Sequence, residues 1–291
     1  AGGMGGTIFS HGGFVNVANS TFTNTKSERT GEFLGGGGSI CSFDGSVNVT
    51  DSTFTDTNAG NMGGSIYSWS TEGTVTVTNS TFTNTTAGQG GAVYTYGGNV
   101  TVSDSSFTNT RGDAGAIFLE GDKNATISNS RFTNIQSTEE GGAIEVTGSG
   151  SVSIFNSTFT NTTSGKDGGA ISTEISNLFI SNCTFNDTTA RDGAGGAIYS
   201  WSANITVSNS QFINNMAKDD GGAIKGENVT VINSSFIDNA AFGDGASIYA
   251  SGLNLKDSTF NSLKADGSAI IHIKSSNNGT VNLNTHTIES T

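Results

Sequence analysis

Acidic side chains recur just before pairs of glycines, and their spacing is the first feature of this sequence that suggests chemistry. They are Asp113, Glu140, Asp167, Asp220, Asp244 and Asp266, with Asp192 nearby. If each repeat forms one layer of a stack, these carboxylates lie about 5 Å apart and repel one another. Calcium between layers would relieve the repulsion, because it binds carboxylate and carbonyl oxygens. The candidate calcium ligands are therefore Glu140, Asp167, Asp220, Asp244 and Asp266.

The alternative for this acidic column is a solvated charged edge, and we expect that outcome. The calcium-binding nonapeptide Gly-Gly-x-Gly-x-Asp is absent from the chain. Lys166, Arg191 and Lys218 lie close to the carboxylates in the sequence and can offset their charge. We accordingly expect no metal and no cofactor.

Aromatic residues form a second column, directly after an aliphatic anchor or two residues further on. Strand alternation places them on the outer face, where we expect one contiguous exposed patch. A large exposed apolar patch usually marks a contact site, for a protein partner or for a sugar. The candidate partner-contact residues are Phe43, Tyr67, Trp69, Tyr94, Tyr96 and Phe118. The alternative is stacking between layers under a covering loop.

Asn-x-Ser/Thr sequons are frequent, and those at outward or turn positions are candidate glycosylation sites. These are Asn48, Asn99, Asn124, Asn186, Asn204, Asn228 and Asn278. Sequons at tight corners, such as Asn79 and Asn156, are expected to be poorly accessible.

The spacing of the acidic, aromatic and asparagine residues follows from a sequence repeat that runs from end to end of the chain. Each unit has a Gly pair followed by an aliphatic anchor, as in Gly195-Gly196-Ala197-Ile198, and a later Phe, as in Phe212. Between them the apolar pattern has period two, as in Val75-Thr76-Val77. Period two predicts strands with Val and Ile inward and Thr outward, and no segment shows the helical period.

One unit of about three short strands cannot bury its own apolar face, but stacked units can. We therefore predict an all-β fold, a right-handed single-stranded parallel β-helix of about eleven coils, as one domain over residues 1–291. Its units are mostly 24–27 residues long. An Asn or Asp three residues before each Phe is expected to form an Asx corner. The members are Asn19, Asp51, Asn79, Asp104, Asn129, Asn156, Asn182, Asn209, Asn233 and Asp257.

Composition excludes several classes of protein. Gly is 42 of 291 residues without Pro, so the chain is not collagen, and 18 Phe argue against disorder. The net charge of −13 disfavours nucleic acid and anionic membranes, and no apolar run is long enough to span a bilayer. Cys41 and Cys183 fall five coils apart, roughly 24 Å, which is too far for a disulfide.

The repeat resembles that of the chlamydial polymorphic membrane proteins, whose marks are Gly-Gly-Ala followed by Ile, Leu or Val, and Phe-x-x-Asn. Gly196-Ala197-Ile198 with its preceding Gly fits the first mark, and Phe212-Ile213-Asn214-Asn215 fits the second. Most other units depart to Phe-Thr-Asn. The resemblance implies a β-helical passenger at a cell surface, often adhesive.

Enzymes that degrade pectin share this architecture, but fold does not fix function. His11, His272 and His286 form no group, and no basic residue repeatedly faces the carboxylates. We predict a protein that is not an enzyme: an extracellular structural or adhesive solenoid at the cell surface. Its partners are other copies of itself, in a filament or lateral assembly, or a surface protein or glycan. No clear end cap is visible, so either the segment belongs to a longer protein or copies stack head to tail.

Overall fold

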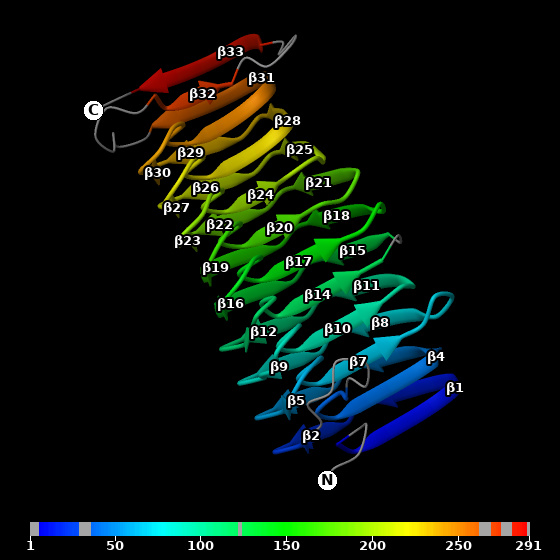
Figure 1. The fold of residues 1–291 in the computed structure, drawn as a ribbon. Helices are drawn as coiled ribbons and strands as arrows, with labels where there is room; N and C mark the ends of the chain where they lie inside the picture. Colours follow the sequence, from blue (N-terminus) through cyan, green and yellow to red (C-terminus); the bar gives the residue numbers. More distant parts are fainter. Residues whose placement is uncertain (1–5, 29–35, 122–123, 262–268, 275–280, 290–291) are drawn as a thin grey trace.

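The chain folds into a stack of parallel strands that climbs from Ile8 to Glu289, as the computed structural model shows in Figure 1. Residues 6–28, 36–121, 124–261 and 269–274 are described in full, and residues 281–289 as backbone. The strand pairings among these residues are parallel, and like residues lie over like, as with Ile198 over Ile224. The predicted all-β parallel solenoid is thereby confirmed.

Three strand faces surround the core, and the first begins at the aliphatic anchor of each unit. Its strands are β1 (Ile8–Ala18), β4 (Ile40–Thr50), β7 (Ile66–Trp69), β10 (Val93–Tyr96), β14 (Ile117–Glu120), β17 (Ile144–Thr147), β20 (Ile171–Thr173), β24 (Ile198–Ser200), β28 (Ile224–Ile232), β31 (Ile248–Asn261) and β32 (Ile271–Ile273). The first-face strands from β4 to β31 are paired one after another, so about nine turns are complete or nearly so. This count is slightly lower than the eleven or so predicted, because the first and last units lie partly outside the described residues.

The second and third faces follow in each turn. The second comprises β8 (Thr74–Thr78), β11 (Asn99–Ser103), β15 (Ala125–Ser128), β18 (Ser151–Phe155), β21 (Asn177–Ser181), β25 (Asn204–Ser208) and the first part of β33 (Val281–Glu289), whose end pairs with the end of β31 on the third face, together with the later parts of β1, β4 and β28 and the middle of β31. The third comprises β2 (Thr21–Thr23), β5 (Thr53–Thr55), β9 (Thr81–Thr83), β12 (Ser106–Thr108), β16 (Arg131–Ser137), β19 (Thr158–Ser164), β22 (Thr184–Asn186), β26 (Gln211–Ile213) and β29 (Ser235–Ile237), and the end of β31.

Short strands mark the turn that returns to the first face. They are β3 (Lys26–Ser27), β6 (Asn58–Ala59), β13 (Arg111–Gly112), β23 (Thr189–Ala190), β27 (Met216–Ala217) and β30 (Ala240–Ala241). Here the Gly pair is needed for two reasons. Gly195 has φ +67°, and a Cβ on Gly196 would collide with the carbonyl oxygen of Gly222 in the next turn.

The core is a set of stacks, of which the phenylalanine stack is the most regular. Nine successive Phe pairs, from Phe22–Phe54 to Phe236–Phe260, have ring centroids 4.6–4.9 Å apart and planes within 7°. That separation equals the spacing of hydrogen-bonded strands, so the backbone ladder sets the ring spacing. The predicted contact between Phe82 and Phe107 is confirmed at 4.8 Å.

Asparagine and aspartate turn the chain on both sides of the Phe strand. The predicted Asx corner has φ between 47° and 53° at every member from Asn19 to Asp257. A second such corner, not predicted, follows the Phe at positions such as Asn134, with φ between 51° and 55°. Asn and Asp tolerate this left-handed conformation better than other side chains that carry a Cβ. Their amides also form a ladder, in which Asn182 donates to Asn156 at 2.7 Å.

Candidate functional site

The aromatic residues predicted to form an exposed patch are instead largely buried, which corrects that expectation. Tyr67 and Tyr94 are 1% exposed and Phe118 is 6% exposed, while Phe43, Trp69 and Tyr96 are partly buried. Together with Cys41 they form a second apolar cluster outside the main core. Strand alternation correctly placed these side chains outside the inner core. It could not show that turn residues, Met62 and Ala114, pack over them.

Stacking within this second cluster is close. Tyr67 and Tyr94 lie 5.3 Å apart between ring centroids, and Trp69 and Tyr96 lie 4.0 Å apart. The Tyr94 hydroxyl donates to Glu120 Oε2 at 2.5 Å. Burial, and then this hydrogen bond, raise the pKa of Tyr94. The cluster is therefore a packed part of the structure, and only its partly buried rim is open to a partner.

The acidic column lies at the turns before the first face, where several of its carboxylates cap backbone groups. Asp167 Oδ1 accepts from the backbone N–H of Ala194 at 2.7 Å, and Asp220 Oδ1 accepts from that of Asp244 at 2.9 Å. Glu140 Oε2 accepts from the Ser172 hydroxyl at 2.9 Å. Burial raises the pKa of Asp167 above its usual range.

These contacts give the carboxylates a role that the calcium hypothesis did not consider. Asp244 lies 3.6 Å from His272 Nδ1, and Asp266 lies outside the described residues. Within the described part of the chain, no group of three or more His, Cys, Asp or Glu is placed to hold a metal ion. Asp167 and Asp220 join successive turns by hydrogen bonds to the backbone, and Glu140 does so through a serine hydroxyl.

The candidate glycosylation sites lie at the surface where the structure describes them. Asn48, Asn99, Asn124, Asn204 and Asn228 are exposed and Asn186 is partly exposed, whereas Asn278 lies outside the described residues. Two of these amides are used in a ladder, since Asn228 Nδ2 donates to Asn204 Oδ1 at 3.2 Å and Asn204 Nδ2 to Asn177 Oδ1 at 3.4 Å. A sugar on either nitrogen would leave one N–H on that amide for the ladder.

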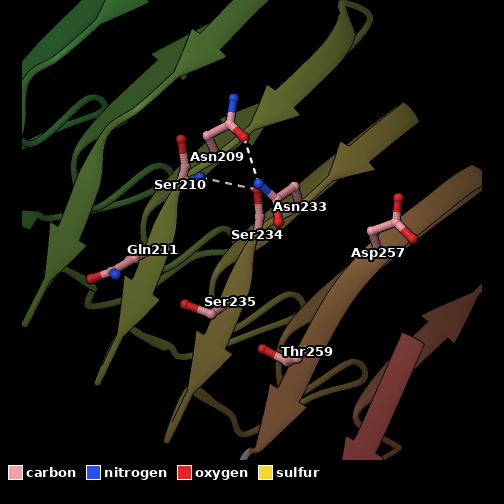
Figure 2. Close-up of a pocket in the computed structure, with 8 residues that line it drawn as sticks. All are labelled: Asn209, Ser210, Gln211, Asn233, Ser234, Ser235, Asp257 and Thr259. Carbon is pink, nitrogen blue, oxygen red and sulfur yellow. Dashed lines mark hydrogen bonds between the residues drawn. The ribbon is translucent and has the colours of Figure 1, made fainter. Parts of the chain in front are cut away.

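A polar groove follows the first Asx corner near the C-terminal end (Figure 2). Its volume is about 230 Å³. Asn233 Nδ2 donates to Asn209 Oδ1 at 2.7 Å, and Ser210 N donates to Ser234 Oγ at 3.1 Å. The groove is thus a stretch of the repeating corner, in which these polar groups bond to the neighbouring turn.

A larger cavity on the first face was not found from the sequence. It has a volume of about 470 Å³ and lies over β24, β28 and β31. The residues that line it are Tyr199, Ser200, Trp201, Ser202, Asp220, Lys225, Gly226, Glu227, Tyr249, Ser251 and Lys274. The phrase Tyr199-Ser200-Trp201 repeats Tyr67-Ser68-Trp69 and was the one available signal. We call this feature the Trp201 cavity.

The two cysteines do not form a further candidate site. Cys41 and Cys183 are both buried and form no disulfide, and burial raises the pKa of Cys183 to about 11. No helix among the described residues is long and apolar enough to cross a membrane.

Comparison with protein families identifies the repeat. The family model described as "right handed beta helix region" matches residues 5–161 and again residues 115–286. The match does not extend to the chlamydial repeat marks. No curated protein and no solved structure matches the chain.

Proposed function

Because the chain belongs to the right-handed β-helix family, we propose that it works as an extracellular structural or adhesive solenoid at a cell surface. In this role a stiff rod holds binding groups away from the cell and resists extension. Family membership supports the rod but not the role, because β-helices serve both as enzymes and as non-catalytic proteins.

The observation that carries the proposal is the uninterrupted stacking of identical side chains. The Phe stack continues through nine pairs without a break, and the main core cluster runs from Val15 to Phe260. In such a stack every interface between turns is built from strand ladders and ring contacts of the same kind, so no single interface is a weak point. An active site requires a group of reactive side chains that differs from the other turns. A scaffold requires only that each turn packs on the next in the same way.

The surface of the solenoid also suits a position outside the cell. The net charge is −13, and Asn ladders and Thr side chains cover the corners and the outward positions of the strands. Such a surface stays solvated and repels other anionic surfaces, which disfavours unspecific association. Glycosylation of the exposed sequons belongs to this proposal.

Self-assembly is a second candidate, favoured by the aromatic side chains of β1. Phe14 is 80% exposed and Phe9 is 51% exposed, although both lie on a regular strand. Exposed aromatic side chains of this size favour contact with another surface. A partner copy that covers these side chains would bury both rings.

Electron microscopy of the native material tests the proposal. Gold-labelled antibodies against the chain should mark rods, stalks or filaments on the surface of intact cells. Label confined to the cell interior would refute the extracellular role. Sedimentation of the purified protein tests assembly separately, since Phe14→Ser should abolish any self-association that uses β1 and leave the fold intact.

A further inference from the structure

The Trp201 cavity differs from the second apolar cluster because its tryptophan is exposed, although Tyr199 in the same strand is buried. Toward the N-terminal end the same column is packed under turn residues as the second apolar cluster. In the cavity, Trp201 is 73% exposed, and Asp220, Lys225 and Glu227 lie around it. A cavity of about 470 Å³ is within the usual size range of small-molecule sites.

The two tryptophans show what is special about this place. Trp69 stacks on Tyr96 at 4.0 Å with an interplanar angle of 12°. For Trp201 no ring lies in stacking contact among the described residues. Its turn is nevertheless fixed, since Ser200 Oγ accepts from Ala203 N at 2.8 Å and Trp201 N donates to Thr173 O at 3.3 Å. The chain thus holds an indole on a fixed turn with its face open.

The wall beside Trp201 is ordered by Lys225. Its Nζ lies 5.8 Å from the Tyr199 ring centroid, 5.3 Å from that of Tyr249 and 3.4 Å from Asp220 Oδ2. Tyr249 in turn stacks on His272 at 5.0 Å. The ammonium group is therefore held between two aromatic rings and a carboxylate before any ligand arrives.

This arrangement combines an open aromatic face with fixed hydrogen-bond donors and acceptors. We propose that the Trp201 cavity binds a pyranose unit of an uncharged glycan. The apolar face of the sugar ring would pack on the Trp201 indole. Its hydroxyl groups would donate to Asp220 and Glu227 and accept from Lys225. This inference rests on the adhesive form of the proposed function and gives it a ligand class.

Charge selects an uncharged sugar over a uronate. Lys225 is already paired with Asp220, and Lys274 balances Glu227, so the lining carries no net charge that would favour an anionic sugar. The chain as a whole carries −13. A polyuronate would therefore gain no net attraction at the site and would meet repulsion from the surface as a whole.

Tryptophan fluorescence provides a direct test, because the chain has only two tryptophans. In Trp69→Phe the emission comes from Trp201 alone, and in Trp201→Phe it comes from Trp69 alone. Soluble cello-, manno-, xylo- and chito-oligosaccharides are titrated into each variant. At least one should shift the emission of Trp69→Phe to the blue with saturation, since the sugar would cover an exposed indole. The same sugar should leave Trp201→Phe unchanged.

Affinity supplies the second measurement. Trp201→Ala should weaken binding of that sugar about tenfold or more in calorimetry, because the stacking face is lost. Trp201 is exposed, so circular dichroism and melting temperature should stay close to the parent values. The matched variant Trp69→Ala should lower the melting temperature and leave binding unchanged.

Three results would overturn the inference. They are no blue shift of Trp69→Phe with any uncharged sugar, equal affinity of Trp201→Ala and the parent protein, and preferential binding of polygalacturonate. None of these bears on whether the rod lies at the cell surface. Cleavage of the bound sugar would instead support the site and refute the proposal of a non-catalytic role.

Discussion

At the scale of single residues, position in the stack decides how much a side chain contributes. Phe132 is fully buried between Phe107 and Phe159, with ring centroids at 4.9 and 4.8 Å. Phe179 lies one strand face away and is 46% exposed. The same residue type therefore has a structural role at one position and little stabilising role at the other.

Phe132→Ala should lower the free energy of unfolding by about 3–5 kcal/mol, because a cavity would interrupt the stack. Chemical denaturation followed by circular dichroism measures this change. The control Phe179→Ala should stay within about 0.5 kcal/mol of the parent protein. Equal effects of the two substitutions would contradict the importance of the stack.

Backbone conformation is the second property that belongs to single residues. Asn134 has φ +55°, and its exposed amide donates to Asn109 at 3.2 Å. Asn134→Ala should cost about 1–2 kcal/mol, since alanine is strained in the left-handed region. Asn134→Gly keeps the conformation and should cost less. A glycine variant as unstable as the alanine variant would show that the amide ladder outweighs the backbone term.

Glu145 gives the fold a dependence on pH. It lies between Phe118 and Ser172 in neighbouring turns, and burial followed by the nearby Glu140, Glu174, Glu139 and Glu120 raises its pKa to about 8. The folded state therefore favours the protonated acid. Its stabilising effect is present at low pH and is lost as the pH rises from about 4.5 to about 8.

Glu145→Gln should accordingly be more stable than the parent protein at pH 8 and similar to it near pH 4.5, because the amide stays uncharged. Urea denaturation at the two pH values measures the difference. Glu227→Gln, an exposed carboxylate in the Trp201 cavity, serves as the control and should show no comparable change. A Glu145→Gln protein without a gain at pH 8 would contradict the burial argument.

At the scale of elements, the buried polar column beside the short returning strands shows how one turn is joined to the next. Thr188 Oγ1 lies 2.6 Å from Gly196 O and 2.7 Å from Asn215 Oδ1. Thr162, one turn earlier, is equally buried, but its Oγ1 has no hydrogen-bond partner among the described residues. The two hydroxyls thus occupy equivalent positions of the repeat. The Thr188 hydroxyl stabilises the fold through its hydrogen bonds, whereas the buried Thr162 hydroxyl destabilises it.

Thr162→Val should raise the stability by about 1 kcal/mol, because it removes a buried hydroxyl that gains no hydrogen bond. Thr188→Val should lower it by about 1–3 kcal/mol, because it leaves Gly196 O and Asn215 with fewer partners. Thermal unfolding of the two variants measures both effects. The same sign for both substitutions would refute this account.

At the scale of the whole molecule, each turn contacts mainly the turns above and below it, so the unit of stability is the repeat. Thr158 pairs with Thr184, and Phe159 stacks on Phe185 at 4.8 Å. Removal of residues 158–183 would join Ser157 to Thr184 and take out one register-matched unit. The remaining Asn, Ser, Thr and Phe would follow in the normal order of the repeat.

Such a deletion variant should fold with an unchanged circular dichroism signal per residue and a modest loss of melting temperature. The control deletes only residues 158–170, which is about half a unit and places unlike side chains over one another. That protein should aggregate or unfold. Cooperative folding of both deletion variants would contradict the in-register core.

Much of this protein is determined by its sequence alone, because like side chains must stack on like. The period-two pattern, the Phe spacing and the Asn or Asp before each Phe predicted the parallel solenoid and its first Asx corner, and each recurs in the structure at the expected residues. A repeat whose every turn carries the same local signals leaves few competing folds.

Which outward side chains reach solvent was decided only by the tertiary structure. Trp69 and Trp201 both lie three residues after the aliphatic anchor of their units, yet Trp69 is partly buried against Tyr96 and Trp201 is 73% exposed. The difference arises from the neighbours, since Tyr96 stacks on Trp69 in a cluster that includes Met62 and Ala114, whereas Trp201 lies beside a cavity. Strand alternation specifies the side of the sheet to which a residue points, whereas burial depends on what the rest of the chain places over it.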